Sequence, residues 1–110
     1  MISSYKFGEM KIKDKTYTSD LIISPSGIKD NWWRKEGHKL FLSDIEDYLT
    51  PDIKRLVIGC GAYGVLKVER EVEDFCKSKN VEIFAKDTKK AVDIFNQSKE
   101  KTIGAFHITC

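Results

Sequence analysis

The chain has 110 residues, the usual length of one domain, so we expect a single α/β domain over residues 1–110. Its 41% hydrophobic and 33% charged residues are typical of a globular protein and exclude a disordered chain. The net charge is +2, and lysines are scattered without a long basic run, which argues against nucleic acid as a partner. No apolar stretch reaches the roughly 18 residues of a membrane span, so we expect no membrane partner.

Three cysteines, Cys60, Cys76 and Cys110, leave at least one thiol unpaired under any disulfide scheme. The N-terminus also lacks the apolar core of an export signal. Reduced thiols in a cytoplasmic protein are therefore the simplest interpretation.

The first third of the chain predicts antiparallel strands. Residues 10–13 alternate apolar and polar side chains, and Asp14 and Lys15 supply a turn into residues 16–23, which are rich in β-branched and aromatic side chains. A Pro-Ser-Gly turn at residues 25–27 then allows a further strand at residues 28–33.

The middle of the chain predicts a short helix followed by a buried strand. Ser43 and Glu46 have the spacing of a capping box, and Pro51 should end the helix they start near Leu49. The apolar run at residues 56–58 is too short for a helix and is typical of a strand buried on both faces.

The last third predicts two helices that alternate with strands. Apolar residues at helical spacing between Val68 and Cys76 indicate an amphipathic helix, and residues 81–85 indicate a second buried strand. Thr88 is positioned to cap a second helix, and residues 103–108 form a third strand. A strand-helix-strand-helix-strand unit implies parallel pairing, so with the N-terminal antiparallel hairpin we expect a three-layer α/β fold with a mixed central sheet.

A glycine-rich loop follows the first buried strand. Residues 59–64, Gly-Cys-Gly-Ala-Tyr-Gly, match the G-x-G-x-x-G pattern of dinucleotide-binding proteins. That pattern binds a pyrophosphate only when a helix begins at the loop, whereas here residues 65–68 intervene before the helix-favouring residues. We therefore favour a glycine-rich turn and predict no cofactor, while a small ligand over the carboxyl ends of the strands stays open.

Cys60 is the candidate nucleophile, because it follows a buried strand inside the glycine loop. It would need His38 or His107 as a base and a lowered thiol pKa, and the sequence supplies no group that lowers it. The competing interpretation is a small, semi-buried residue that fills the turn.

Two further patterns in the sequence bear on binding chemistry. His107 and Cys110 are three residues apart, so in a strand they face opposite sides and cannot converge unless the strand ends between them; we predict no metal site. Trp32, Trp33 and Arg34, with Gly37 and His38, place aromatic, cationic and titratable groups together. Either these residues form a recognition patch, or one tryptophan belongs to the core and the other residues to a solvated loop.

Several landmarks occur together in one order along almost the whole chain. They are Tyr5-Lys6-Phe7-Gly8, Asp20-Leu21-Ile22-Ile23, Trp33-Arg34 with Gly37-His38, Leu56-Val57-Ile58-Gly59-Cys60-Gly61, Gly64-Val65-Leu66, and Ala105-Phe106-His107-Ile108-Thr109-Cys110.

With these landmarks the chain resembles a family of small domains of unknown function. Its eukaryotic members include an adipogenesis-associated protein and a mitochondrial complex I assembly factor. The resemblance implies a three-layer α/β fold with a mixed sheet, no established enzymatic activity or cofactor, and, for the assembly factor, binding to other proteins. The positions that match include Gly59, Gly61, Gly64, His107 and Cys110, to which the resemblance assigns no chemistry.

Our leading hypothesis is a non-catalytic binding or assembly module that docks a protein partner or self-associates. The alternative is a small-ligand-binding protein or enzyme with its pocket between the glycine loop and residues 33–38. The candidate ligand-binding residues are Gly59, Cys60, Gly61, Tyr63, Gly64, Trp33, Arg34 and His38, of which Cys60 and His38 are the catalytic candidates.

Overall fold

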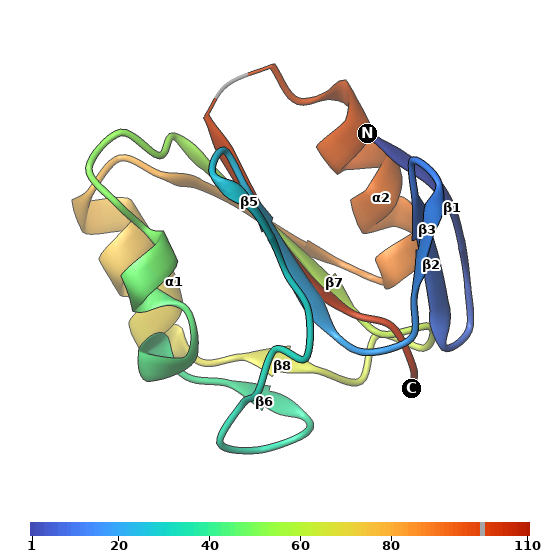
Figure 1. The fold of residues 1–110 in the computed structure, drawn as a ribbon. Helices are drawn as coiled ribbons and strands as arrows, with labels where there is room; N and C mark the ends of the chain where they lie inside the picture. The colour runs from blue at the N-terminus through green and yellow to red at the C-terminus, as the bar shows by residue number, and fades with distance from the viewer. Residues whose placement is uncertain (100) are drawn as a thin grey trace.

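The computed structural model describes residues 1–99 and 101–110, which form three layers around a five-stranded mixed sheet (Figure 1). The strand order in this sheet is β5-β4-β10-β7-β9. Its strands are β4 (Leu21–Ser24), β5 (Gly27–Lys29), β7 (Arg55–Cys60), β9 (Glu82–Lys86) and β10 (Thr102–His107).

The predicted parallel unit is confirmed. β7 lies between β10 and β9 and pairs in parallel with both, with Leu56 opposite Ile103 on one side and Ile83 on the other. β4 pairs with β10 in the antiparallel direction, which makes the sheet mixed. The α/β class expected from the sequence is therefore the observed one.

The N-terminal strands form a second sheet of their own. β1 (Ile2–Lys6), β2 (Glu9–Ile12) and β3 (Lys15–Tyr17) make an antiparallel three-stranded sheet. The prediction of one strand over residues 16–23 is wrong, because the chain leaves this sheet after β3 and enters the central sheet at β4. The strand predicted over residues 28–33 is also too long: β5 ends at Lys29, and Asn31 has a φ of 51°, which a strand does not accommodate.

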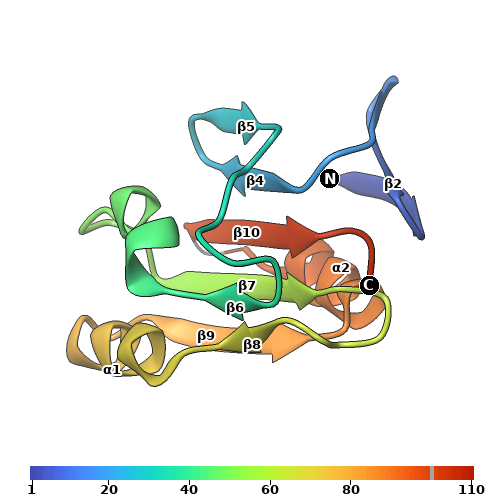
Figure 2. The same cartoon turned by 90° about the horizontal axis from the view of Figure 1, so that it is seen from below.

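The helices cover opposite faces of the central sheet. α1 (Arg70–Ser78) lies on one face, and α2 (Thr88–Gln97) lies on the other beside the N-terminal sheet (Figure 1). A short parallel pair, β6 (Lys39–Leu40) and β8 (Lys67–Val68), adds to the α1 side (Figure 2). Within the described ranges, no helix has the length and apolar character needed to cross a membrane.

Side chains that point alternately to the two faces of the central sheet divide the core into two clusters. Leu56 and Ile58 point to the α1 side, where they pack with Val72. Val57, between them, belongs to the α2 side with Phe106. A strand buried on both faces produces this division, because successive side chains leave it in opposite directions.

Three local expectations about helix starts are wrong. The short helix predicted from Ser43 is a pair of 3-10 helices that ends at Tyr48, as expected, but Asp44, not Glu46, reaches back to accept from a backbone amide, that of Phe41 at 2.9 Å. Val68 lies in β8, before α1 begins. The cap of α2 is Asp87, whose carboxylate accepts from the Lys90 amide at 3.0 Å, because the hydroxyl of the adjacent threonine is used in the interior.

The absence of a side chain at Gly104 gives a testable consequence. A Cβ atom there would lie 2.6 Å from Phe106 Cε2 and 2.8 Å from Phe95 Cδ1, whose rings pack edge to face over β10. We expect Gly104→Ala to lower the free energy of unfolding by about 1–3 kcal/mol, because the two rings must shift. The measurement is urea unfolding followed by fluorescence.

Gly37→Ala is the matched control, because a Cβ at Gly37 meets no atom within 4 Å. Equal stability of the two variants would contradict the packing account of Gly104.

Candidate functional site

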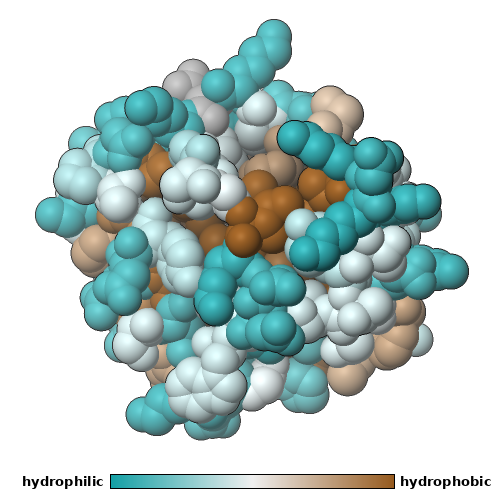
Figure 3. Space-filling view, in the orientation of Figure 1, coloured by the Kyte–Doolittle hydropathy of each residue, from teal (hydrophilic) through white to brown (hydrophobic). Residues whose placement is uncertain are grey.

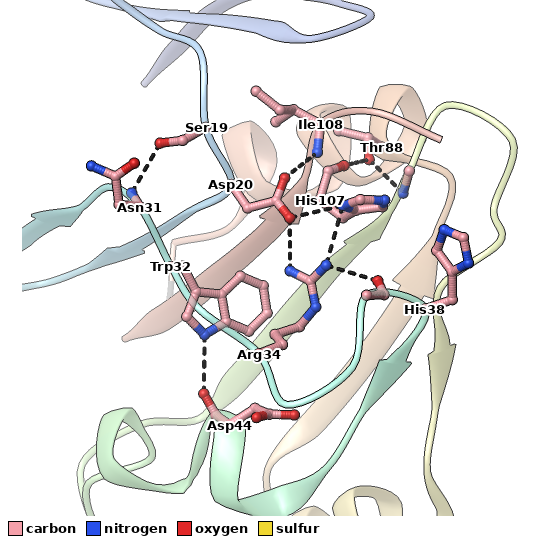
Figure 4. Close-up of polar contacts among 12 residues, drawn as sticks. Ser19, Asp20, Asn31, Trp32, Arg34, His38, Asp44, Thr88, His107 and Ile108 are labelled. Atoms are coloured by element: carbon pink, nitrogen blue, oxygen red, sulfur yellow. Dashed lines mark hydrogen bonds and ion pairs between the residues drawn. The ribbon is translucent and has the colours of Figure 1, made fainter.

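Three polar side chains from distant parts of the chain meet at the carboxyl end of β10 (Figure 4). The Asp20 carboxylate lies 2.8 Å from His107 Nδ1 and accepts a hydrogen bond of 2.8 Å from Arg34 Nη1. The side chains of Arg34 and His107 are 4% and 8% exposed, so the pairings form largely out of water. Because these groups are buried, removal of one of them leaves a buried charge or polar group without a partner, which destabilises the fold.

Asp20 is held in its charged form by donors on three sides. Besides His107 and Arg34, the backbone amide of Ile108 donates to its Oδ1 at 2.9 Å. Burial acts to raise the pKa of Asp20, but the hydrogen bonds from His107, the Ile108 amide and Arg34 outweigh it, and the pKa lies below its usual value. The carboxylate is therefore a permanent acceptor at neutral pH.

The permanent charge on Asp20 fixes the tautomer of His107. A carboxylate oxygen only accepts, so the 2.8 Å contact places a proton on Nδ1 of the imidazole. Arg34 Nη2 lies 3.3 Å from the same nitrogen, but a protonated Nδ1 cannot accept from it. Nε2 of His107 is buried and has no hydrogen-bond partner among residues 1–99 and 101–110.

Arg34 ties the following loop to this cluster. Its Nη2 donates to the Gly37 carbonyl at 2.9 Å, and its guanidinium lies over the Trp32 ring, 4.8 Å from the centroid. Trp32 in turn donates from Nε1 to the Asp44 carbonyl at 3.0 Å. These contacts hold the segment that carries His38 against the end of the sheet.

Backbone groups of the glycine loop are hydrogen-bonded to other parts of the protein. Gly61 donates its amide to Thr88 Oγ1 at 2.9 Å, and its carbonyl accepts from the Thr88 amide at 3.0 Å. The Ala62 amide donates to the Thr109 carbonyl at 2.7 Å, and the Gly64 amide returns to Gly61. Amides occupied in this way cannot hold a phosphate.

The position of the next helix leads to the same conclusion. The expectation that the helix begins too late for a dinucleotide site is confirmed, because α1 starts at Arg70 and β8 lies between it and the loop. The G-x-G-x-x-G sequence here is a turn between strands, and Gly61 and Gly64 adopt positive φ angles of 96° and 68° in it.

Cys60 is a poor nucleophile in this setting. The residue is buried at the end of β7, and burial, together with the negative charge of Asp87, raises the pKa of the thiol to about 11. Its sulfur lies 4.0 Å from the Ile58 carbonyl rather than against a histidine. At neutral pH such a thiol stays protonated, which opposes the catalytic role considered for it.

His38, His107 and Cys110 converge at the end of the sheet. β10 ends at His107, so the chain turns before Cys110 and the two side chains are not held on opposite faces of a strand. One ligand atom from each of the three residues lies within 4.8 Å of the other two, and Cys110 Sγ is 3.9 Å from His38 Nε2. The exception considered in the sequence, a strand that ends between His107 and Cys110, is the observed case.

The other candidate residues are dispersed. Trp33 is 76% exposed and lines a hollow with Lys29 and Tyr48, away from the glycine loop. Tyr63 is equally exposed, and its ring contacts that of Phe7. An open hollow lies at Cys60 and Gly64, and none of residues 33–38 lines it. It is lined by Cys60, Gly64, Leu66, Lys67, Val68, Glu73, Ala85, Lys86 and Asp87.

Comparison with known proteins identifies the family. The family model described as a protein of unknown function, DUF498/DUF598, matches residues 2–107. The chain belongs to this family. The crystal structure of the conserved hypothetical protein PH1505 from Pyrococcus horikoshii OT3 is similar with a TM-score of 0.84 at 29% identity, covering 100% of this chain and 99% of that one.

Two other solved structures share the fold of this DUF498/DUF598 domain. An outer membrane protein from Bartonella henselae has a TM-score of 0.82 at 23% identity, covering 99% of this chain and 94% of that one. The protein MT938 has a TM-score of 0.78 at 21% identity, covering 100% and 98% of the two chains. At these identities the likeness concerns the fold alone.

Asp20 and Thr88 lie outside the candidate set chosen from the sequence, as do His107 and Cys110. Asp20 precedes the apolar run of β4, and an acidic residue next to a buried strand is the signal that could have drawn attention to it. Thr88 is fully buried, and its hydroxyl donates to the His107 carbonyl while accepting from the Gly61 amide. A threonine at a helix start is indistinguishable from a cap until the tertiary contacts are known.

The buried cluster predicts a loss of stability on Asp20→Asn. This change removes the charge that faces Arg34 and should lower the free energy of unfolding by about 3 kcal/mol at pH 7. Because the folded pKa of Asp20 is lowered, its contribution is complete above the unfolded pKa and is lost as the pH falls through the folded value. The variant should therefore show a smaller loss of stability on acidification.

Urea unfolding at neutral and acidic pH measures both effects. Asp14→Asn, at an exposed carboxylate, is the control for removal of one negative charge. If Asp20→Asn and Asp14→Asn have the same free energy of unfolding, the buried cluster does not stabilise the fold.

Proposed function

We propose that this DUF498/DUF598 domain is a non-catalytic protein-binding module that contacts its partner through the aromatic pair Phe7 and Tyr63. The two side chains are 56% and 76% exposed, and their ring centroids are 6.3 Å apart. Large aromatic side chains in contact with each other and with solvent are the observation that carries this proposal. Such residues are enriched among the energetically dominant residues of protein interfaces.

The fold holds both rings at the same end of the molecule. Phe7 lies in the turn between β1 and β2, and the adjacent Gly8 amide donates to the Ile108 carbonyl at 2.7 Å. Tyr63 lies in the loop after β7, which is tied to the C-terminal segment by the bond from Ala62 to Thr109. Both segments are therefore fixed to the end of β10, and a partner would bind them at a small cost in conformational entropy.

The chemistry of the molecule favours the same role. The face in Figure 3 is mainly hydrophilic and has a central apolar patch framed by hydrophilic side chains. Cys60, with its raised pKa, does not supply a nucleophile. The resemblance to a family branch with a mitochondrial complex I assembly factor also favours protein binding over catalysis.

The test removes both rings and measures binding to an identified partner. Proteins captured from native lysate by the wild-type chain are purified, and the dissociation constant of each is measured for wild type and for Phe7→Ser combined with Tyr63→Ser. Loss of two interface aromatics should weaken binding by at least about 30-fold, the equivalent of about 2 kcal/mol. Light scattering on the purified chain reports whether the partner is a second copy.

Trp33→Ser is the matched control, because Trp33 is an exposed aromatic away from the pair. Binding that survives the double change, or a monomeric chain that captures no partner, contradicts the proposal.

A second candidate function, binding of a small ligand, is favoured by the open hollow beside the glycine loop. The hollow measures about 410 Å³, and Cys60, Lys67 and Lys86 are among its lining residues. It lies at the carboxyl ends of β7 and β9, where ligands of open α/β sheets gather. Lys67 and Lys86 are positioned to contact an anionic group of a small metabolite, and Glu73 and Asp87 a cationic group of the same compound.

Thermal unfolding in the presence of a metabolite panel tests this candidate. We expect a compound with both an anionic and a cationic group to raise the Tm of the wild type and of Tyr63→Phe, since Tyr63 does not line the hollow. The same compound should raise the Tm of Lys67→Ala combined with Lys86→Ala by much less. A panel without effect on the wild type removes the support for this function.

A further inference from the structure

We propose that His38, His107 and Cys110 bind one zinc(II) ion through three protein ligands, with the fourth position open to water. Their ligand atoms lie within 4.8 Å of one another. Two imidazoles and one thiolate are a ligand set that suits zinc, whereas magnesium and calcium require oxygen ligands. The inference goes beyond the proposed protein-binding role and does not depend on it.

His107 is already arranged as a metal ligand. Its Nδ1–H donates to the Asp20 carboxylate, which leaves the lone pair of Nε2 free. Nε2 is buried and unpartnered among the described residues, which is costly for a polar atom unless something binds it. Metal-ligating histidines usually donate their other ring nitrogen to a carboxylate or carbonyl in this way.

The geometry of the histidine pair is consistent with a shared ion. Figure 4 shows His107 between Asp20 on one side and His38 on the other, and the two imidazole centroids are 6.1 Å apart. Tetrahedral zinc with bonds of about 2.0–2.3 Å places its ligand atoms about 3.3–3.6 Å apart. The 3.9 Å between Cys110 Sγ and His38 Nε2 is close to that value. Small side-chain rotations complete the site, because both residues are exposed.

The backbone on each side of the site is fixed by hydrogen bonds. The Lys67 amide donates to the His38 carbonyl at 2.9 Å, and the Ala62 amide donates to the Thr109 carbonyl at 2.7 Å. Gly61 makes the close approach possible, because a Cβ atom at that position would lie 2.5 Å from the Cys110 carbonyl oxygen and 2.8 Å from His107 Cδ2. The ligands therefore come from three segments that the fold already holds together.

The charges around the site permit a cation. Arg34 approaches His107, but its guanidinium pairs with Asp20 at 2.8 Å, so the two charges offset each other. Binding breaks the S–H bond of Cys110, forms a zinc–sulfur bond and releases the proton to solvent. The thiolate then offsets one of the two positive charges of the ion.

The experiment measures zinc and cobalt binding to the reduced, metal-free protein. Competition with a chromophoric chelator should give one zinc ion per chain, and cobalt(II) should show the charge-transfer absorption of a thiolate ligand. His38→Ala and Cys110→Ser should each weaken zinc binding by at least 100-fold, and zinc should raise the Tm of the wild type but not that of these two variants. Both side chains are exposed, so both variants should fold, and their Tm in chelator checks this.

Glu36→Ala is the matched control, because Glu36 is an exposed carboxylate in the same loop as His38 and should leave zinc affinity unchanged. Failure of the wild type to bind zinc stoichiometrically overturns the proposal. So does zinc affinity that survives both ligand changes, or a cobalt complex without the thiolate absorption.

Discussion

The buried carboxylate of Asp20 is the interaction on which the functional end of this domain depends. It accepts from the His107 imidazole, the Arg34 guanidinium and the Ile108 amide, so one side chain joins β10 to two segments of the first third of the chain. Arg34 extends this connection to the loop of His38 through the Gly37 carbonyl. Because the donors cannot be satisfied by water at this depth, the three segments are stable only together.

The glycine loop shows how context decides the chemistry of a motif. In a dinucleotide-binding protein the same glycine spacing leaves amides free at a helix N-terminus. Here those amides are taken by Thr88, Thr109 and the turn itself, and a strand follows the loop instead of a helix. The glycines serve to bring the C-terminal segment against the loop, since a side chain at Gly61 would collide with Cys110 and His107.

Two features therefore lie at one end of the molecule. The aromatic pair Phe7 and Tyr63 and the cluster of His38, His107 and Cys110 are both supported by the C-terminal segment after β10. Figures 1 and 2 place the C-terminus beside the loop that follows β7. A partner seated on the aromatic pair would lie close to that segment, which gives the two proposals a common location while leaving their tests separate.

The sequence by itself determined the parallel part of the fold. The apolar runs at residues 56–58 and 103–108 and the helical spacing around Val72 are strong local patterns, which tertiary context overrides less often than it does turns and caps. The sequence also marks Cys60, His38, Arg34 and Trp33 as chemically distinctive residues. Only the tertiary structure decided their roles: Arg34 became a buried anchor, Cys60 a buried thiol, and Trp33 an isolated surface residue.

Features that the sequence left undecided depend on contacts between residues that are far apart in the chain. The break before β4, the interior role of Thr88 and the convergence of His107 with His38 all depend on residues far apart in the chain. Asp20 and His107 are separated by 87 positions, and no periodicity links residues at that distance. Their pairing follows from the antiparallel addition of β4 to β10, which places the start of one strand beside the end of the other.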